Sequence, residues 1–124
     1  MIPEIKGLDS SDVYDLESFI PEDKDYFGFP LAIKAGPKNE NGSDLFYLYV
    51  CTTKYFENEF LNKEHILNGR HHLFVGKYDY DLIVKYINDL MPKCEGVNWQ
   101  ECAIKIGRYA KWEFEDYNEY KEID

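Results

Sequence analysis

The clearest candidates for covalent or metal chemistry in this sequence are Cys51, His71 and His72. A thiolate beside an imidazole is the usual arrangement of a nucleophilic cysteine. Cys51, however, ends a strongly apolar run, where an unpaired cysteine is most often a small buried side chain. His71 and His72 are adjacent at the start of an expected strand, so their side chains should point to opposite faces. We therefore expect no catalytic pair and no shared metal site.

Carboxylates are abundant, and pairs of them could serve as general acid and base. Such catalysis requires a cleft and shifted pKa values, neither of which a sequence reveals, so solvated surface charge is the simpler interpretation. The glycines at 36 and 42 form neither GxxxxGK[ST] nor GxGxxG, the spacings that cradle phosphate. The sequence therefore predicts no catalytic residue, no cofactor and no metal, and the protein is not expected to be an enzyme.

The cysteines and the start of the chain indicate a compartment. Cys51, Cys94 and Cys102 are odd in number and lack CxxC spacing, which is typical of reduced thiols and predicts no disulfide. Met1–Lys6 has neither the basic nor the apolar part of a secretory signal, and no apolar run reaches membrane-spanning length. We expect a cytoplasmic protein without membrane contact.

The charge balance limits the partners that the chain can bind. The 14 Lys and Arg residues stand against 24 Asp and Glu, which gives a formal net charge of −10. Such a field repels nucleic acid and attracts a basic protein. Acidity also keeps a protein soluble without any role in recognition. Direct binding of DNA or RNA is not expected.

Periodicity predicts the elements that position these residues. Residues 27–35 alternate with a period of two, as in a strand with one buried face, and the turn residues 36–43 predict a hairpin loop. Residues 45–52 are apolar on both faces, as in an antiparallel strand near the middle of a sheet. Pro30 cannot donate a ladder hydrogen bond, which favours an edge position or a bulge.

The second half of the chain combines helices and short strands. Thr53 can cap a short helix to about Lys63, and residues 72–78 have the composition of a third strand. Asp79 can cap a helix that Pro92 ends, and Asn98 with Glu101 predicts a capping box for a last helix. The expected apolar faces of these two helices are Leu82, Ile83, Tyr86, Ile87 and Leu90 on the first and Trp99, Cys102, Ala103 and Ile106 on the second.

The expected fold is a single α+β domain over residues 1–124. Residues 112–117 alternate aromatic and acidic side chains and predict a last strand or a docked extended segment. Consecutive strands followed by helices favour a mainly antiparallel sheet of about four to five strands with about two to three helices on one face. Trp99 and Trp112 are expected to be core anchors.

The order of these features resembles the immunity protein 8 family of bacterial polymorphic toxin systems. The resemblance covers roughly residues 26–117: the strand into Gly36-Pro37, the strand ending Val50-Cys51-Thr52, the junction Tyr78-Asp79-Tyr80, Trp99 opening a helix, and Trp112-Glu113-Phe114. Lys54 departs from the expected pattern, which has proline at that position. The resemblance implies an α+β protein that neutralises a cognate toxin by tight binding. We expect a monomer or a weak homodimer.

An acidic inhibitor of this kind would suit a basic target such as a nuclease toxin. Clusters that interleave acids with tyrosines are the candidate contact residues, because tyrosine supplies rigid contact area. The partner-binding residues predicted on this ground are Glu113, Glu115, Asp116, Tyr117, Asp79, Tyr80, Asp81, Tyr47 and Tyr49. A further acidic group comprises Asp15, Glu17, Glu22, Asp23 and Asp25. The alternative is a non-catalytic adaptor or structural subunit that binds a constitutive basic partner.

Overall fold

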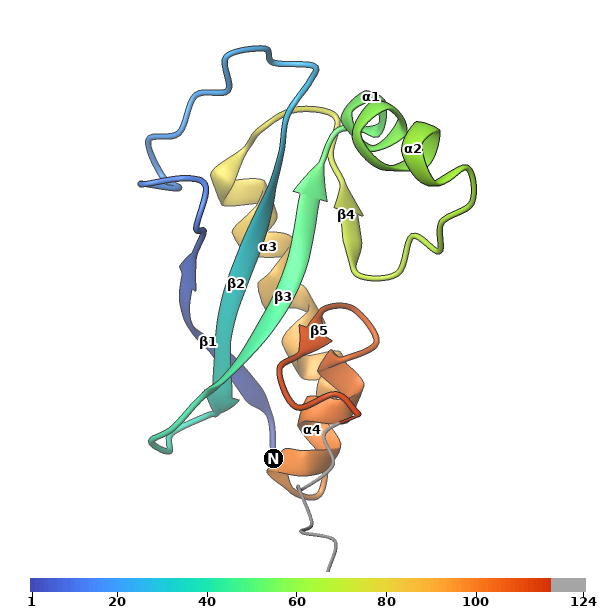
Figure 1. Cartoon of the computed structure of the whole chain (residues 1–124). Helices are drawn as coiled ribbons and strands as arrows, with labels where there is room; N and C mark the ends of the chain where they lie inside the picture. The colour runs from blue at the N-terminus through green and yellow to red at the C-terminus, as the bar shows by residue number, and fades with distance from the viewer. Residues whose placement is uncertain (117–124) are drawn as a thin grey trace, which may run out of the picture.

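A computed structural model describes residues 1–116 of the chain (Figure 1). The elements in chain order are β1 (Pro3–Asp9), β2 (Gly28–Pro37), β3 (Asp44–Cys51), α1 (Thr53–Phe56), the π-helical turn η1 (Glu57–Leu61), α2 (Asn62–Glu64), β4 (His72–Phe74), α3 (Tyr80–Leu90), the 3-10 turn η2 (Met91–Cys94), α4 (Trp99–Ile106) and β5 (Lys111–Trp112). The α+β prediction is confirmed.

The strands form one sheet in the order β1-β2-β3-β4, with β5 also pairing with β3. The pairs β1–β2, β2–β3 and β3–β5 are antiparallel, whereas β4 runs parallel to β3. β4 and β5 share the same side of β3, because β5 pairs at Phe46 and Tyr47 and β4 at residues 49–51. β3 is therefore central, as its apolar sequence predicts.

The hairpin of β2 and β3 is the longest pairing in the sheet. Its register runs from Gly28 opposite Cys51 to Ala35 opposite Asp44. β2 is an interior strand, but β1 reaches along it only as far as Ala32, so Pro30 lies where β2 has no second neighbour. The missing N–H of Pro30 thus falls on a locally open edge, which is the physical reason that proline is tolerated there.

The strand β1 was not predicted from the sequence. Its partly buried residues Ile5 and Leu8 are three positions apart, because the register shifts between Ile5 and Gly7 and leaves Lys6 unpaired in a bulge. A bulge of this kind breaks the period of two by which a strand is recognised in sequence. β1 nevertheless pairs along much of β2.

Several element boundaries differ from the sequence predictions. The residue that precedes α1 is Thr52 rather than Thr53, and it makes no side-chain cap: its hydroxyl lies 3.4 Å from the backbone nitrogen and 3.5 Å from the carbonyl oxygen of Phe27. β4 is only three residues long, and the segment after Trp112 turns through residues 113–116 instead of continuing as a strand. Contacts with Phe27, the residue before β2, thus take the place of the expected cap.

The two long helices begin where their capping residues predict. Asp79 accepts a hydrogen bond from the backbone nitrogen of Leu82 at 3.1 Å, and Asn98 accepts one from that of Glu101 at 2.9 Å. α3 ends at Leu90, and η2 continues from it with Pro92 in its first turn. Both helices lie behind the sheet in Figure 1, on one of its faces.

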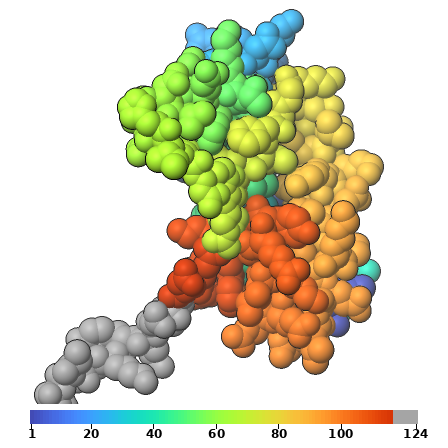
Figure 2. Space-filling view, turned by 90° about the vertical axis from the view of Figure 1, so that its right-hand side faces the viewer, coloured from blue at the N-terminus to red at the C-terminus, as the bar shows by residue number. Residues whose placement is uncertain are grey.

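The segment from α1 to α2 lies over the opposite face, at one end of the sheet. Figure 2 shows it in green above the orange surface of α4. Its contact with the sheet depends on Gly28: a Cβ atom there would come within 2.3 Å of the Tyr55 ring. Among the described residues 1–116, no other helix lies over this outer face (Figure 1).

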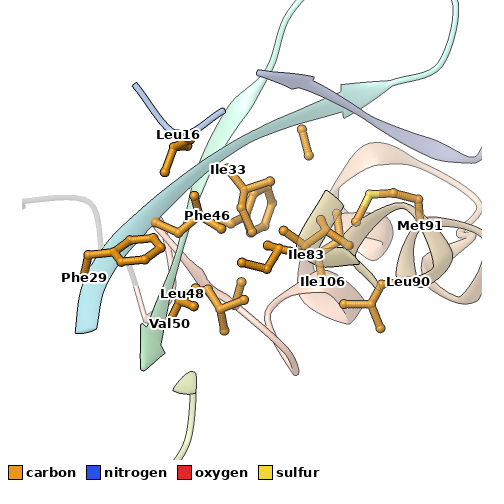
Figure 3. Close-up of a cluster of buried hydrophobic side chains, with 14 of the residues drawn as sticks. Leu16, Phe29, Ile33, Phe46, Leu48, Val50, Ile83, Leu90, Met91 and Ile106 are labelled. Carbon is orange, nitrogen blue, oxygen red and sulfur yellow. The ribbon is translucent and has the colours of Figure 1, made fainter. Parts of the chain in front are cut away.

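The hydrophobic core fills the space between the sheet and α3 and α4 (Figure 3). Inward-pointing residues of β2 and β3, such as Leu31, Ile33 and Phe46, meet Ile83 and Ile87 of α3. The expected apolar face of α3 proved too wide: Ile83, Ile87 and Leu90 are buried, but Leu82 is 58% and Tyr86 41% exposed. The expected face of α4 is confirmed, with Cys102, Ala103 and Ile106 buried and Trp99 packed against the core.

Candidate functional site

Each residue considered for chemistry is either buried or in contact with a backbone carbonyl group. Cys51 is fully buried, and burial raises the pKa of its thiol to about 11, which keeps it protonated at neutral pH. The Nε2 atom of His71 lies 2.7 Å from the carbonyl oxygen of Gly107, while His72 Nδ1 lies 2.9 Å from the carbonyl oxygen of Arg70. Within residues 1–116, no group of three His, Cys, Asp or Glu side chains could hold a metal ion.

Trp99 and Trp112 meet at one carboxylate. The indole Nε1 atoms of both donate to Oδ2 of Asp44, at 2.7 and 3.1 Å, and thereby connect α4 and β5 to the start of β3. Both rings also pack against the core, and Trp99 contacts Phe46 edge-on. The expectation that both tryptophans are core anchors is confirmed.

The acidic residues that follow β5 make structural bonds. Glu113 accepts a hydrogen bond from the backbone nitrogen of Leu45 at 3.1 Å, and Glu115 forms an ion pair with Arg70 at 2.6 Å. Asp116 adopts a left-handed backbone in the turn. Tyr117, also predicted to contact a partner, lies outside the described residues. Glu113 and Glu115 thus hold the turn of residues 113–116 against β3 and the loop before β4.

Asp79, Tyr80 and Asp81 lie at the other end of the molecule, at the start of α3. Asp79 is the cap described above. Tyr80 lines a hollow of about 440 Å³ together with Asp9, Asp15 and Glu17. The predicted contact residues at the two ends of the sheet are therefore not parts of one surface.

The loop between β1 and β2 adds to the acidic character of that end. It carries the acidic group predicted from the sequence, and its Tyr14 and Ile20 side chains are almost fully exposed. Val13 and Leu16 of the same loop are buried, and the hydroxyl of Tyr78 donates to the carbonyl oxygen of Leu16. The loop is therefore anchored to the core and displays an aromatic and an aliphatic side chain among acids.

Tyr47 and Tyr49 both point to the outer face of the sheet, because they alternate with the buried Phe46, Leu48 and Val50. Tyr47 is 42% exposed and lies opposite Lys111 of β5. Tyr49 belongs to what we term the outer aromatic cluster, whose rings contact one another under and beside α1 and η1: Tyr49, Tyr55, Phe56, Phe60, His72 and Phe74.

The outer aromatic cluster was not predicted as a unit. The rings of Phe56 and Phe60, one helical turn apart, have centroids 5.8 Å from each other. Their meeting with His72 and Phe74 depends on the parallel pairing of β4 with β3, which places His72 opposite Tyr49. The sequence indicates this contact between α1, η1 and β4 only by two runs of aromatic residues, one on each side of the exposed loop between α2 and β4.

The described residues thus form a small α+β protein with two notable surfaces. One is the acidic end, formed by the start of α3 and the loop between β1 and β2, and the other is the aromatic outer face. None of the helices in residues 1–116 is long and apolar enough to cross a membrane. The family model described as immunity protein 8 matches residues 3–117. The chain belongs to the immunity protein 8 family. Neither the curated proteins nor the solved structures contain a significant match to it.

Proposed function

We propose that this chain is an immunity protein that binds a cognate polymorphic toxin and neutralises the toxin by blocking the surface through which the toxin acts. The observation that carries the proposal is the family match over residues 3–117, which spans nearly all of the described chain. The buried, protonated thiol of Cys51 agrees with a protein that acts by binding rather than by chemistry.

The charge of the chain supports a basic target. A nuclease toxin must hold phosphate in a basic groove, and an inhibitor of net charge −10 approaches such a groove faster than a neutral protein would. The acidic end exposes Tyr14 and Ile20 among acidic residues. In protein interfaces, a few such apolar side chains commonly supply most of the binding energy.

Protection in cells tests the proposal directly. The toxin domain encoded beside this gene is expressed with and without the chain, and growth is measured. We expect growth only when the chain is present, and equally with its Cys51→Ala variant, because the proposal assigns that thiol no reaction. Toxicity that persists at equal toxin levels would reject the immunity function and leave an adaptor as the remaining candidate.

Association kinetics test the electrostatic part separately. The triple variant Asp12→Asn, Asp15→Asn, Glu17→Gln removes three charges from the acidic end, and Glu64→Gln, Asp89→Asn, Glu95→Gln removes three elsewhere. We expect the first to lower the association rate with an inactive form of the toxin more than the second, and both effects to fade at high salt. An association rate that is indifferent to salt would exclude steering while leaving inhibition itself intact.

A further inference from the structure

The outer edge of β4 is unpaired in the described part of the chain. β4 pairs with β3 through residues on one side of its backbone: His71 accepts from the nitrogen of Tyr49 at 3.0 Å, and the nitrogen of Val75 donates to Cys51 at 3.0 Å. Successive residues of a strand direct their backbone groups to opposite sides, so those of His72 and Phe74 point away from β3. Within residues 1–116, no other strand pairs with this edge.

An apolar groove lies beside this edge, between β4 and α3. Its volume is about 560 Å³, and its walls are Leu73, Phe74, Val75, Gly76 and Lys77 on one side and Asp79, Leu82, Ile83 and Tyr86 on the other. Three large side chains of the groove remain open to solvent: Leu82 at 58%, Phe74 at 45% and Tyr86 at 41% exposure. Figure 2 views the molecule from this side, with α3 in yellow to orange beside β4.

An apolar groove beside an unpaired strand edge differs from a single exposed hydrophobic residue. Single apolar side chains on a surface need no explanation, but a contiguous apolar set beside a strand edge is typical of a binding surface. Proteins usually protect such an edge with lysines, a proline or a covering loop. Phe74, the last residue of β4, instead exposes an aromatic ring there.

We propose that an extended segment of the toxin adds as a strand to the outer edge of β4 and inserts alternate apolar side chains into the groove. This inference rests on the function proposed above and specifies where binding takes place. Backbone pairing with His72 and Phe74 would give the segment its direction and register. Contacts with Leu82, Ile83 and Tyr86 would give it selectivity for apolar side chains at every second position.

Charge distinguishes this occupant from a second copy of the chain. The two charged residues that line the groove, Lys77 and Asp79, have opposite signs, so together they contribute no net charge. The net charge of −10 of the whole chain therefore determines which partner is attracted at long range. Two copies of the chain repel each other, and each offers only a three-residue edge. A basic toxin is attracted, and its segment can extend beyond the edge along α3.

Substitutions in the groove test the proposal against a matched control. Leu82→Glu places a charge in the groove at an exposed helical position, and Ile104→Glu places the same charge at a 54% exposed position of α4 outside it. The growth assay identifies the toxin, and an inactive form of it is titrated into each variant by calorimetry. Leu82→Glu should raise the dissociation constant about tenfold or more. Ile104→Glu should bind as wild type does.

Two outcomes of this titration have different meanings. If wild type protects cells and Leu82→Glu binds equally well, the groove is rejected and the immunity function stands. If wild type neither protects nor binds, the immunity function fails and this inference with it. Circular dichroism of both variants establishes that they are folded before they are compared.

Hydrogen exchange tests the strand pairing itself. In the unbound protein we expect the amides of His72 and Phe74 to exchange quickly and that of Leu73 slowly. Of these three amides, only that of Leu73 faces β3. Toxin binding should slow the amides of His72 and Phe74. Unchanged exchange at both would reject strand addition, and a concentration-dependent dimer that Leu82→Glu abolishes would assign the groove to a second copy.

Discussion

Two aromatic clusters lie on opposite faces of the same end of the sheet and have opposite characters. The inner aromatic cluster comprises Phe19, Phe27, Phe29 and Tyr78, whose rings meet mostly edge-on with centroids 4.9–6.4 Å apart. Phe27 and Phe29 are buried there. The rings of the outer aromatic cluster keep similar distances, but Phe74 is 45% exposed and its companions are only partly buried.

The difference follows from what covers each cluster. The inner one is continuous with the core under α3 and is closed by the loop of residues 10–27, through the bond from Tyr78 to Leu16. Within residues 1–116, the outer one is covered only by α1, η1 and α2, none of which contains a fully buried residue. The inner cluster therefore stabilises the fold, while the outer one leaves apolar surface beside the open edge of β4.

The largest expected effect is a loss of stability on the inner side. Phe29→Ala removes a ring that is 2% exposed, and we expect it to lower the free energy of unfolding by about 3–5 kcal/mol. Phe60→Ala in the outer cluster should cost less, about 1–2 kcal/mol, because that ring is only partly buried. Urea denaturation measures both, and equal losses would contradict the distinction between the clusters.

Gly28 tests the contact of the outer cluster with the sheet. Gly28→Ala places a methyl group within 2.3 Å of the Tyr55 ring, which must move away, at an expected cost of about 1–3 kcal/mol. The added cost should largely disappear in a Tyr55→Ala background, as a double-mutant cycle would show. Gly7→Ala is the matched control, because its new Cβ would meet only the Lys34 side chain, at 3.5 Å.

The cap of α3 affects the inner side by a smaller amount. Asp79→Ala leaves the backbone nitrogen of Leu82 without its 3.1 Å partner, and we expect about 1 kcal/mol of lost stability. Asp81→Ala, in the same first turn, loses only a favourable interaction with the helix dipole, about 0.3–0.5 kcal/mol. Thermal unfolding of both variants should therefore rank Asp79→Ala as the less stable.

Alkaline titration, whose effect is absent at neutral pH, compares a tyrosine from each cluster. Burial raises the pKa of Tyr78 to about 12, and burial together with the hydroxyl of Tyr55 also raises the pKa of Tyr49. Their ordinary value is 10.0, so the folded state holds these protons after the unfolded state has lost them. The stability from both groups is complete below about pH 10 and declines as pH rises toward 12.

Tyr78→Phe and Tyr49→Phe should each reduce this decline, as urea unfolding at a series of alkaline pH values would show. A slope that neither variant alters would mean that other groups govern alkaline unfolding. A slope altered by Tyr78→Phe alone would mean that the outer tyrosine titrates as it does in the unfolded chain.

Local signals in the sequence were sufficient for much of the fold. The hairpin of β2 and β3, the caps at Asp79 and Asn98 and the buried Cys51 all follow from patterns within a few residues of each site. β1 was missed because its bulge disrupts the alternation, and the cap at Thr53 was wrong because Thr52 bonds to Phe27, 25 positions earlier.

The contact residues stay a prediction, whereas the fold class is confirmed. Acid and tyrosine composition predicted Glu113 and Glu115, whose carboxylates the fold places against Leu45 and Arg70. Composition does not signal the groove that Phe74 and Leu82 line. A side chain's availability to a partner depends on what the rest of the chain places beside it, which composition does not contain.

The sequence by itself determined the α+β class, the acidic field, the starts of α3 and α4 and the family, because these depend on composition and on short-range order. Only the tertiary structure decided that β4 runs parallel to β3, that the aromatic rings divide into an inner and an outer cluster, and that Leu82 and Tyr86 border a groove instead of the core. The physical reason is that these contacts join residues distant in the chain, so packing against the single sheet, rather than local periodicity, selects which face of each element is covered.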